Sequence, residues 1–235
     1  MTIEQSKEKL KKEGYTWFEL NEFDPEFYNW LLPLKCNKEN NLKNKIKELR
    51  MDMARNPKIP NHQIKEMFET HDLASEKKNW IVNEYKHITN FSQIWYYGDL
   101  NTMFNPNTSE DDYKNYKKYV KNIVNHFFDF EKNQQYSDLS FCTYYDEDCH
   151  LQNHSDGTGT GRVCALLIYL NETYDEKDGG VLVLNNTEKV IPTFGKVAMI
   201  DLQTFDIPHM VTKVTGGIGR YAILSFVKKT QNEFK

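Results

Sequence analysis

Glycine is distributed very unevenly along the chain. Only Gly14 and Gly98 precede residue 150, whereas nine of the 11 glycines lie between Gly157 and Gly219. Because glycine readily adopts the positive φ angles of tight turns, we expect many turns in the second half and few in the first. The sequence contains no internal repeat and no linker rich in Pro, Ser or Gly. We therefore expect a single domain over residues 1–235, built from two layers rather than from two tethered units.

Helical patterns dominate residues 1–135. Asp24 followed by Pro25 is a typical N-cap and first helical residue, and the apolar side chains after this pair recur at helical spacing. Elsewhere in this half, apolar residues three and four apart indicate amphipathic helices. The expected helices are Ile3–Lys12, Asp24–Leu32, Asn40–Asn56 and Glu110–Phe130.

Residues 136–230 contain short runs of β-branched and aromatic residues, each bounded by Gly, Asn, Asp or Pro. The runs that predict strands are Leu139–Tyr145, Val163–Leu170, Gly180–Leu184, Val197–Leu202 and Tyr221–Val227. Short strands at intervals of about 8–12 residues are typical of a sandwich or barrel. Helices followed by a series of strands predict an α+β fold rather than a parallel βαβ sheet.

Composition excludes several classes of protein. Aromatic residues make up 14% of the chain, which is enough to build a core, and the net charge of -4 gives no general attraction to nucleic acid or to anionic membranes. No apolar run approaches about 18 residues, and the charged N-terminus has no apolar signal-peptide core. We expect a cytoplasmic protein that binds neither nucleic acid nor membrane, with its oligomeric state left open. The cysteines expected to be reduced are Cys36, Cys142, Cys149 and Cys164.

His154 and Asp156 form a His-x-Asp motif. Residues two apart in an extended segment project to the same face, so the imidazole and the carboxylate can bind one metal ion. Alone, such a motif is more often a surface pair; His209 and Arg220 downstream are what favour a metal site here. Two histidines and one carboxylate leave a face of the metal open, as non-haem Fe(II) oxygen chemistry requires. The planar guanidinium of Arg220 suits bidentate binding of a carboxylate.

Over residues Leu139–Lys228 the chain resembles the Fe(II)/2-oxoglutarate-dependent oxygenases, and among them the prolyl 4-hydroxylase-like branch. The motifs that carry the resemblance are His154-x-Asp156, Ile168–Asn171 (IYLN) followed by Gly179-Gly180, His209, and Arg220–Ile223 (RYAI). The resemblance implies a double-stranded β-helix, which is a cupin-like jelly-roll, as the catalytic core in residues 136–230. Residues 1–135 would then pack helices on one sheet and supply the substrate walls.

The resemblance also assigns roles by position. It implies that the catalytic iron ligands are His154, Asp156 and His209. Arg220 would bind the distal carboxylate of 2-oxoglutarate. Tyr145 and Tyr169 match positions at which the family contacts this co-substrate. Tyr144 is the alternative to Tyr145, because adjacent strand residues face opposite ways.

The activity implied by the resemblance is hydroxylation of an unactivated C–H bond with Fe(II), 2-oxoglutarate and O2, with ascorbate as an optional cofactor. The first expected substrate is a prolyl residue in a peptide or protein; the alternative is a free amino acid or another small molecule. A non-catalytic cupin-like binding module and a zinc hydrolase are rival interpretations. The module would need neither Arg220 nor an intact triad, and the hydrolase would work without O2. The expected substrate walls include Trp95–Gly98 and Asn101–Asp112.

Overall fold

The computed structural model describes residues 1–37, 80–87, 91–99, 110–129, 136–145, 147, 149–159, 161–217 and 219–229. The strands form two sheets in which neighbours run antiparallel. The large sheet has the spatial order β1 (Tyr15–Glu19), β9 (Lys196–Asp201), β6 (Arg162–Tyr169), β11 (Arg220–Lys229), β4 (Tyr136–Tyr145), β3 (Phe91–Asp99) and β2 (Trp80–His87). The small sheet has the order β5 (Leu151–His154), β10 (His209–Val211), β7 (Leu182–Leu184) and β8 (Glu188–Val190).

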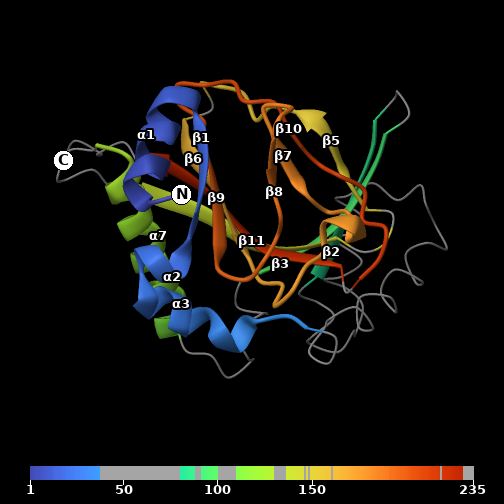
Figure 1. Cartoon of the computed structure of the whole chain (residues 1–235), viewed down its shortest axis with the longest axis horizontal. Coiled ribbons are helices and arrows are strands. Elements are labelled where there is room, and N and C mark those ends of the chain that lie inside the picture. Colours follow the sequence, from blue (N-terminus) through green and yellow to red (C-terminus); the bar gives the residue numbers. More distant parts are fainter. Residues whose placement is uncertain are drawn as a thin grey trace.

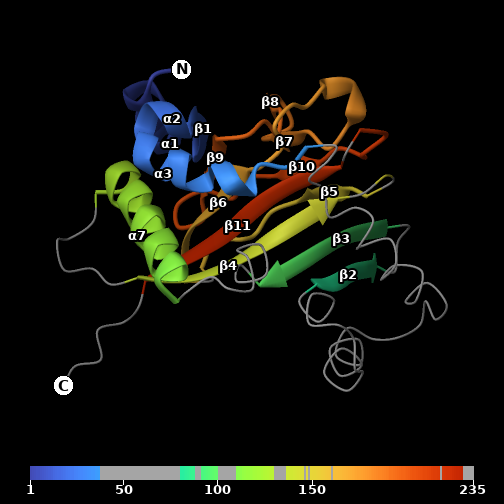
Figure 2. The same ribbon diagram turned by 90° about the horizontal axis from the view of Figure 1, so that it is seen from below.

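The α-helices gather on one side of the large sheet, and the small sheet lies on its other side (Figures 1 and 2). The α-helices are α1 (Ile3–Glu13), α2 (Leu20–Phe23), α3 (Pro25–Leu31) and α7 (Glu110–Phe127), and the 3-10 helices are η1 (Leu32–Leu34) and η2 (Glu176–Asp178). This arrangement confirms the α+β double-stranded β-helix with helices packed on one sheet. The two sheets are not closed into a barrel.

Side chains of the central strands alternate between two hydrophobic cores. In β11, Tyr221 and Ile223 pack toward the helices, whereas Ala222 lies in the core between the two sheets. β6 and β9 alternate in the same way. This is the two-residue period of a strand that is buried on both faces. Arg220, two residues before Ala222, therefore faces the space between the sheets.

A buried polar contact joins the helical layer to the last strand. The hydroxyl groups of Tyr116 on α7 and Ser225 on β11 are 2.6 Å apart, and Ser140 on β4 lies 2.7 Å from Ser225. Ser225 is fully buried and has the same parity along β11 as Tyr221 and Ile223. Its hydroxyl is thus committed to the helix side of the sheet.

The local signals for helices hold where the structure describes them. Asp24 caps α3 by accepting a hydrogen bond of 2.9 Å from the backbone N–H of Phe27, and Pro25 is the first helical residue. The expected helices Ile3–Lys12, Asp24–Leu32 and Glu110–Phe130 correspond to α1, α3 and α7. The helix expected at Asn40–Asn56 lies outside the described residues.

All five predicted strands are present, as β4, β6, β7, β9 and β11, and three strands that were not predicted lie in residues 1–135 beside the helices. β1, β2 and β3 lie in that half and extend the large sheet at both edges. Trp95–Gly98 belongs to β3, and of Asn101–Asp112 only the last three residues, which begin α7, are described. β5, β8 and β10 are three or four residues long, too short to leave a periodic pattern in the sequence.

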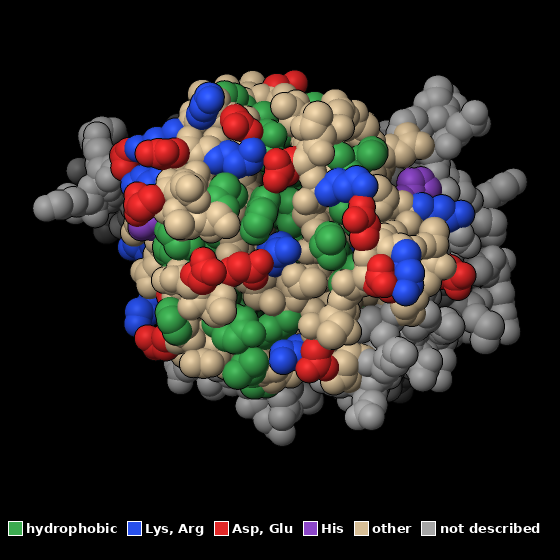
Figure 3. Space-filling view, in the orientation of Figure 1, with side chains coloured by type: hydrophobic (Ala, Val, Ile, Leu, Met, Phe, Trp, Pro, Cys, Tyr) green, Lys and Arg blue, Asp and Glu red, His purple; other side chains and the backbone are tan. Residues whose placement is uncertain are grey.

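The surface carries both signs of charge. On the face seen in Figure 3, acidic and basic side chains are interspersed among polar and apolar ones over the described part of the chain. None of the described helices combines the length and the apolar composition needed to cross a membrane.

Candidate metal centre

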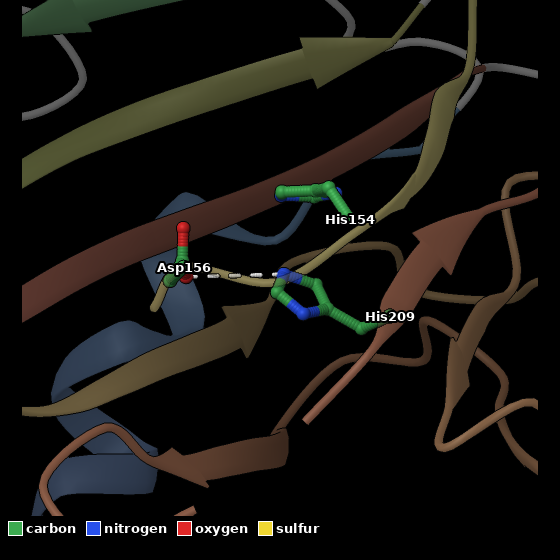
Figure 4. Close-up of side chains that lie close together, drawn as sticks. All are labelled: His154, Asp156 and His209. Atoms are coloured by element: carbon green, nitrogen blue, oxygen red, sulfur yellow. Dashed lines mark ion pairs between the residues drawn. The ribbon is translucent and has the colours of Figure 1, made fainter. Parts of the chain in front are cut away.

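Two neighbouring short strands bring two histidines together. His154 is the last residue of β5 and His209 the first of β10, and the two are register partners in the small sheet. Their ring centres are 4.2 Å apart. Asp156 follows β5 and points its carboxylate at the same space, as Figure 4 shows. One ligand atom from each of the three residues lies within 4.8 Å of the others, which is the spacing of a site for one metal ion.

Hydrogen bonds fix which nitrogen of each imidazole is available. Nδ1 of His154 lies 2.8 Å from the carbonyl of Gln152, and Nδ1 of His209 lies 3.1 Å from the carbonyl of Ile207. Because a carbonyl only accepts, each Nδ1 carries the hydrogen and each Nε2 keeps its lone pair. This backbone contact is the kind of outer partner that orients metal-binding histidines.

Burial favours the neutral form of His209. Its side chain is 8% exposed, and its pKa is lowered by burial and, to a smaller extent, by His154. The hydrogen bond to Ile207 and the charge of Asp156 act in the opposite direction. A neutral imidazole is the form that binds a metal, so the site is preset for a ligand role.

Asp156 is held from two sides. Its Oδ2 lies 3.8 Å from Nε2 of His209, and its Oδ1 lies 3.8 Å from Nη1 of Arg162 at the start of β6. The Arg162 guanidinium in turn lies over the Phe226 ring, 4.0 Å from its centre. The structure thus places Arg162 as a partner of the Asp156 carboxylate.

A buried arginine, Arg220, lies apart from the triad on the large sheet. It is the first residue of β11 and is 1% exposed. Nη2 donates a long hydrogen bond of 3.4 Å to the hydroxyl of Tyr169, and Nε is buried with no hydrogen-bond partner in the ranges that the structure describes. Among the described residues, none places a carboxylate within ion-pair distance of Arg220. A buried cation that lacks a counter-ion costs several kcal/mol, about 3–5, so this one calls for an anion.

Two tyrosines enclose the Arg220 guanidinium. Its carbon is 4.8 Å from the ring centre of Tyr145 and 5.1 Å from that of Tyr169. Burial raises the pKa of Tyr145 to about 12 and also raises that of Tyr169, although the Arg220 charge opposes both shifts. Both phenols stay protonated at neutral pH. Tyr144, the alternative to Tyr145, is opposite Tyr221 in the strand register, whereas Tyr145 is opposite Arg220.

Asn171 holds the backbone on both sides of Arg220. Its amide nitrogen donates to the carbonyl of Gly219 at 2.7 Å, and its amide oxygen accepts from the backbone N–H of Tyr221 at 2.8 Å. Asn171 is fully buried. Its part in fixing Arg220 was missed from the sequence, where it stood only as the last residue of the IYLN motif.

The sequence-derived site residues therefore form two groups. His154, Asp156 and His209 converge in one group, and Arg220, Tyr145 and Tyr169 converge in the other. Sequence reasoning missed the contact between Arg162 and Asp156.

A jelly-roll that presents two imidazoles and one carboxylate to a single point defines a class of metal-dependent β-sandwich enzymes. Within that class, residues 139–228 match the model of the 2OG-Fe(II) oxygenase superfamily. The matched segment contains the triad and Arg220, so these residues are similar to that superfamily in the part of the chain that carries the site. The match to this family model implies Fe(II), 2-oxoglutarate and O2 as cofactor and co-substrates. A comparison with curated proteins finds no match.

Solved structures share the fold. A prolyl-4-hydroxylase from Pseudomonas putida is 15% identical, with a TM-score of 0.54, and the match covers 98% of this chain and 100% of that one. A prolyl hydroxylase from Trichoplax adhaerens, in complex with a hypoxia inducible factor peptide fragment, is 14% identical, with a TM-score of 0.55 and coverage of 96% and 88%. An oxidoreductase of the 2OG-Fe(II) oxygenase family from Burkholderia pseudomallei is 12% identical, with a TM-score of 0.51 and coverage of 97% and 91%. At these identities the likeness concerns the fold.

The residues present fit the implied groups. Two imidazole nitrogens and one carboxylate oxygen are the donor set of non-haem Fe(II) oxygenases. The unpaired Nε of buried Arg220 fits a ligand with a carboxylate that is separate from its metal-binding end, as 2-oxoglutarate has.

Proposed function

We propose that this protein is an Fe(II)- and 2-oxoglutarate-dependent dioxygenase that hydroxylates a prolyl residue in a peptide or protein. The observation that carries the proposal is the presence, in one fold, of a convergent His-Asp-His triad and a buried arginine for which the described residues provide no counter-ion. A ligand-binding module of the same fold requires neither feature.

The chain's own residues have separate tasks in this activity. His154 and His209 would hold Fe(II) through Nε2, and Asp156 would bind through Oδ2 while Arg162 attracts its other oxygen. Bound Fe(II), with 2-oxoglutarate and O2, supplies the oxidising chemistry for the C–H bond. Arg220 would fix the far end of 2-oxoglutarate and so set its orientation relative to the triad.

The apolar core between the sheets limits access of water to this site. Leu184, the register partner of His209, belongs to this core together with Tyr145 and Tyr169. A dry surrounding strengthens the pairing of Arg220 with a carboxylate. It also keeps solvent from competing for the open side of the metal.

Support for a prolyl substrate comes from the fold shared with two prolyl hydroxylases, one of which was solved with a peptide fragment. A screen of proline-containing peptides against free amino acids, with the mass gain of one oxygen as the readout, tests this part of the proposal. Hydroxylation of free amino acids alone would refute the peptide substrate and leave the reaction type intact.

The reaction type has a direct test. The purified chain is incubated with Fe(II) and 2-oxoglutarate in air, and succinate is measured with and without O2. Succinate that requires both Fe(II) and O2 supports the dioxygenase. Hydrolytic activity with Zn(II) that persists without O2 would instead identify a zinc hydrolase.

We also propose that residues 1–235 act as one domain in a reducing compartment such as the cytoplasm. β1 pairs with β9, and the helices of the first half pack on the central strands, so the N-terminal residues are part of the same core. Cys36, Cys149 and Cys164 are buried cysteines in the reduced form. These observations support the proposal, which limited proteolysis and fractionation of cells would test.

A further inference from the structure

We propose that Tyr174 is a further binding residue for the distal carboxylate of 2-oxoglutarate, donating a hydrogen bond from its hydroxyl beside Arg220. This inference rests on the proposed function and deepens it. It names a phenol in the loop between β6 and η2 that the sequence did not single out.

The hydroxyl of Tyr174 is buried, and no residue in the described part of the chain forms a hydrogen bond with it. A buried donor without a partner costs about 1–3 kcal/mol, so such a group calls for a ligand or an ordered water. Arg220 Nε is in the same condition. The described interior thus contains two buried donors without partners, the neutral Tyr174 hydroxyl and the charged Arg220 guanidinium.

Gly180 places the two groups close together. A Cβ at this position would lie 2.5 Å from the Tyr174 hydroxyl oxygen and 3.3 Å from Cβ of Arg220. The tyrosine hydroxyl and the base of the arginine side chain thus flank the same glycine. The missing side chain leaves room for the hydroxyl to reach the arginine.

The electrostatics agree with this placement. Burial raises the pKa of Tyr174 to about 12, and the positive charge of Arg220 acts against that rise. The phenol therefore remains protonated at neutral pH and can donate. The Tyr174 hydroxyl is therefore a neutral donor beside the Arg220 guanidinium, and both groups favour the same kind of acceptor, an anion.

The geometry of Arg220 indicates how the carboxylate would bind. Nε and Nη2 share one edge of the planar guanidinium, and this edge offers two parallel N–H groups to a carboxylate. Nη2 already contacts the Tyr169 hydroxyl at 3.4 Å. This hydrogen bond is long, and a carboxylate, as a better acceptor, would replace it. Tyr174 adds a neutral donor to this charged pair. The set would select a 2-oxo acid with a second carboxylate.

The substitution Tyr174→Phe tests the inference because it removes only the hydroxyl. Binding of 2-oxoglutarate is measured by calorimetry under nitrogen with Fe(II), so that no turnover occurs. Binding of 2-oxopentanoate, which has the same carbon chain but no distal carboxylate, is measured in parallel. The matched control is Tyr221→Phe, the same change in the residue after Arg220, whose ring packs in the helix-side core.

We expect Tyr174→Phe to weaken 2-oxoglutarate binding about tenfold, with unchanged affinity for 2-oxopentanoate and for Fe(II). Tyr221→Phe should leave all three affinities as they are. Parental affinity for 2-oxoglutarate in Tyr174→Phe, or equal losses for both acids, would overturn the inference. A parent protein that binds no 2-oxoglutarate with Fe(II) would overturn the proposed function itself, so the two failures are distinct.

Discussion

Arg220 lies directly opposite Tyr145 in the antiparallel pair of β11 and β4, with its guanidinium carbon 4.8 Å from the centre of the tyrosine ring. The ring stabilises the charge through its π electrons but occupies no strong acceptor position. The N–H groups of the guanidinium therefore remain available for an anion. The strand register thus places an aromatic ring beside a buried cation, although the two residues are 75 positions apart in the sequence.

Replacement of Arg220 by lysine should weaken 2-oxoglutarate binding roughly 10–100-fold. Lysine keeps the charge but presents one point donor in place of the two-donor edge, and about 1.4 kcal/mol corresponds to each tenfold. Arg220→Ala should weaken 2-oxoglutarate binding further, because the distal carboxylate of 2-oxoglutarate then has no charged partner. The effect is measured as the affinity for 2-oxoglutarate without O2 and as its Km in turnover. The affinity for Fe(II) should stay unchanged. Unchanged 2-oxoglutarate binding in either variant would move the assignment to Arg162.

Removal of either imidazole should abolish Fe(II)-dependent turnover. His154→Ala and His209→Ala each leave two ligands, too few to hold the metal in a fixed geometry, and Asp156→Gly should also stop hydroxylation. Metal analysis after dialysis and succinate formation are the measurements. Ser155→Ala, an exposed position between two of the ligands, is the matched control and should behave as the parent. Full activity in a histidine variant would remove that residue from the site.

Asn171→Ala should impair both stability and co-substrate binding. The change leaves the Gly219 carbonyl and the Tyr221 N–H without their partners, at about 1–3 kcal/mol for each buried group. Because these two groups flank Arg220, we also expect the Km for 2-oxoglutarate to rise more than kcat falls. Denaturant unfolding and steady-state kinetics check the two effects. Asn29→Ala, on the exposed face of α3, is the control. A loss of stability with unchanged Km would make Asn171 purely structural.

Gly179 and Gly159 should differ strongly in their tolerance of alanine. Both have positive φ, 73° and 82°, which side-chain-bearing residues rarely adopt, so alanine is strained at either position. A Cβ at Gly179 would also lie 1.8 Å from the Lys213 carbonyl oxygen, whereas one at Gly159 meets nothing within 4 Å. Gly179→Ala should therefore lower the free energy of unfolding by clearly more than Gly159→Ala. Equal losses would show that the backbone near Lys213 moves away freely.

The buried thiols should react slowly in the folded protein. Burial raises the pKa of Cys36 to about 12 and raises that of Cys164 as well, so little thiolate exists at pH 8. Alkylation followed by peptide mass spectrometry should label both residues quickly only after unfolding. A thiol reductant should leave the melting temperature unchanged. Rapid labelling of the native protein at pH 8 would contradict this.

Much of the β-rich half could be predicted because each strand is an apolar run bounded by turn residues. The order of His154, Asp156, His209 and Arg220 then predicted two groups that the structure does bring together. β2 and β3 were overlooked, although both are rich in aromatic and β-branched residues, because they lie in the half where helical spacing and scarce glycine favoured helices. Tyr174 could not be predicted, since its position depends on how a loop returns to Gly180.

The two-sided burial of β11 limits how this gene can change by insertion or deletion. Odd-numbered residues such as Tyr221 and Ile223 support the helices, and even-numbered ones such as Arg220 and Ala222 face the other layer. A point substitution alters one layer at a time. Loss or gain of a single codon within the strand would exchange the roles of all later positions at once. Length variation among descendants of this sequence should therefore accumulate in loops, while the span of β11 stays constant.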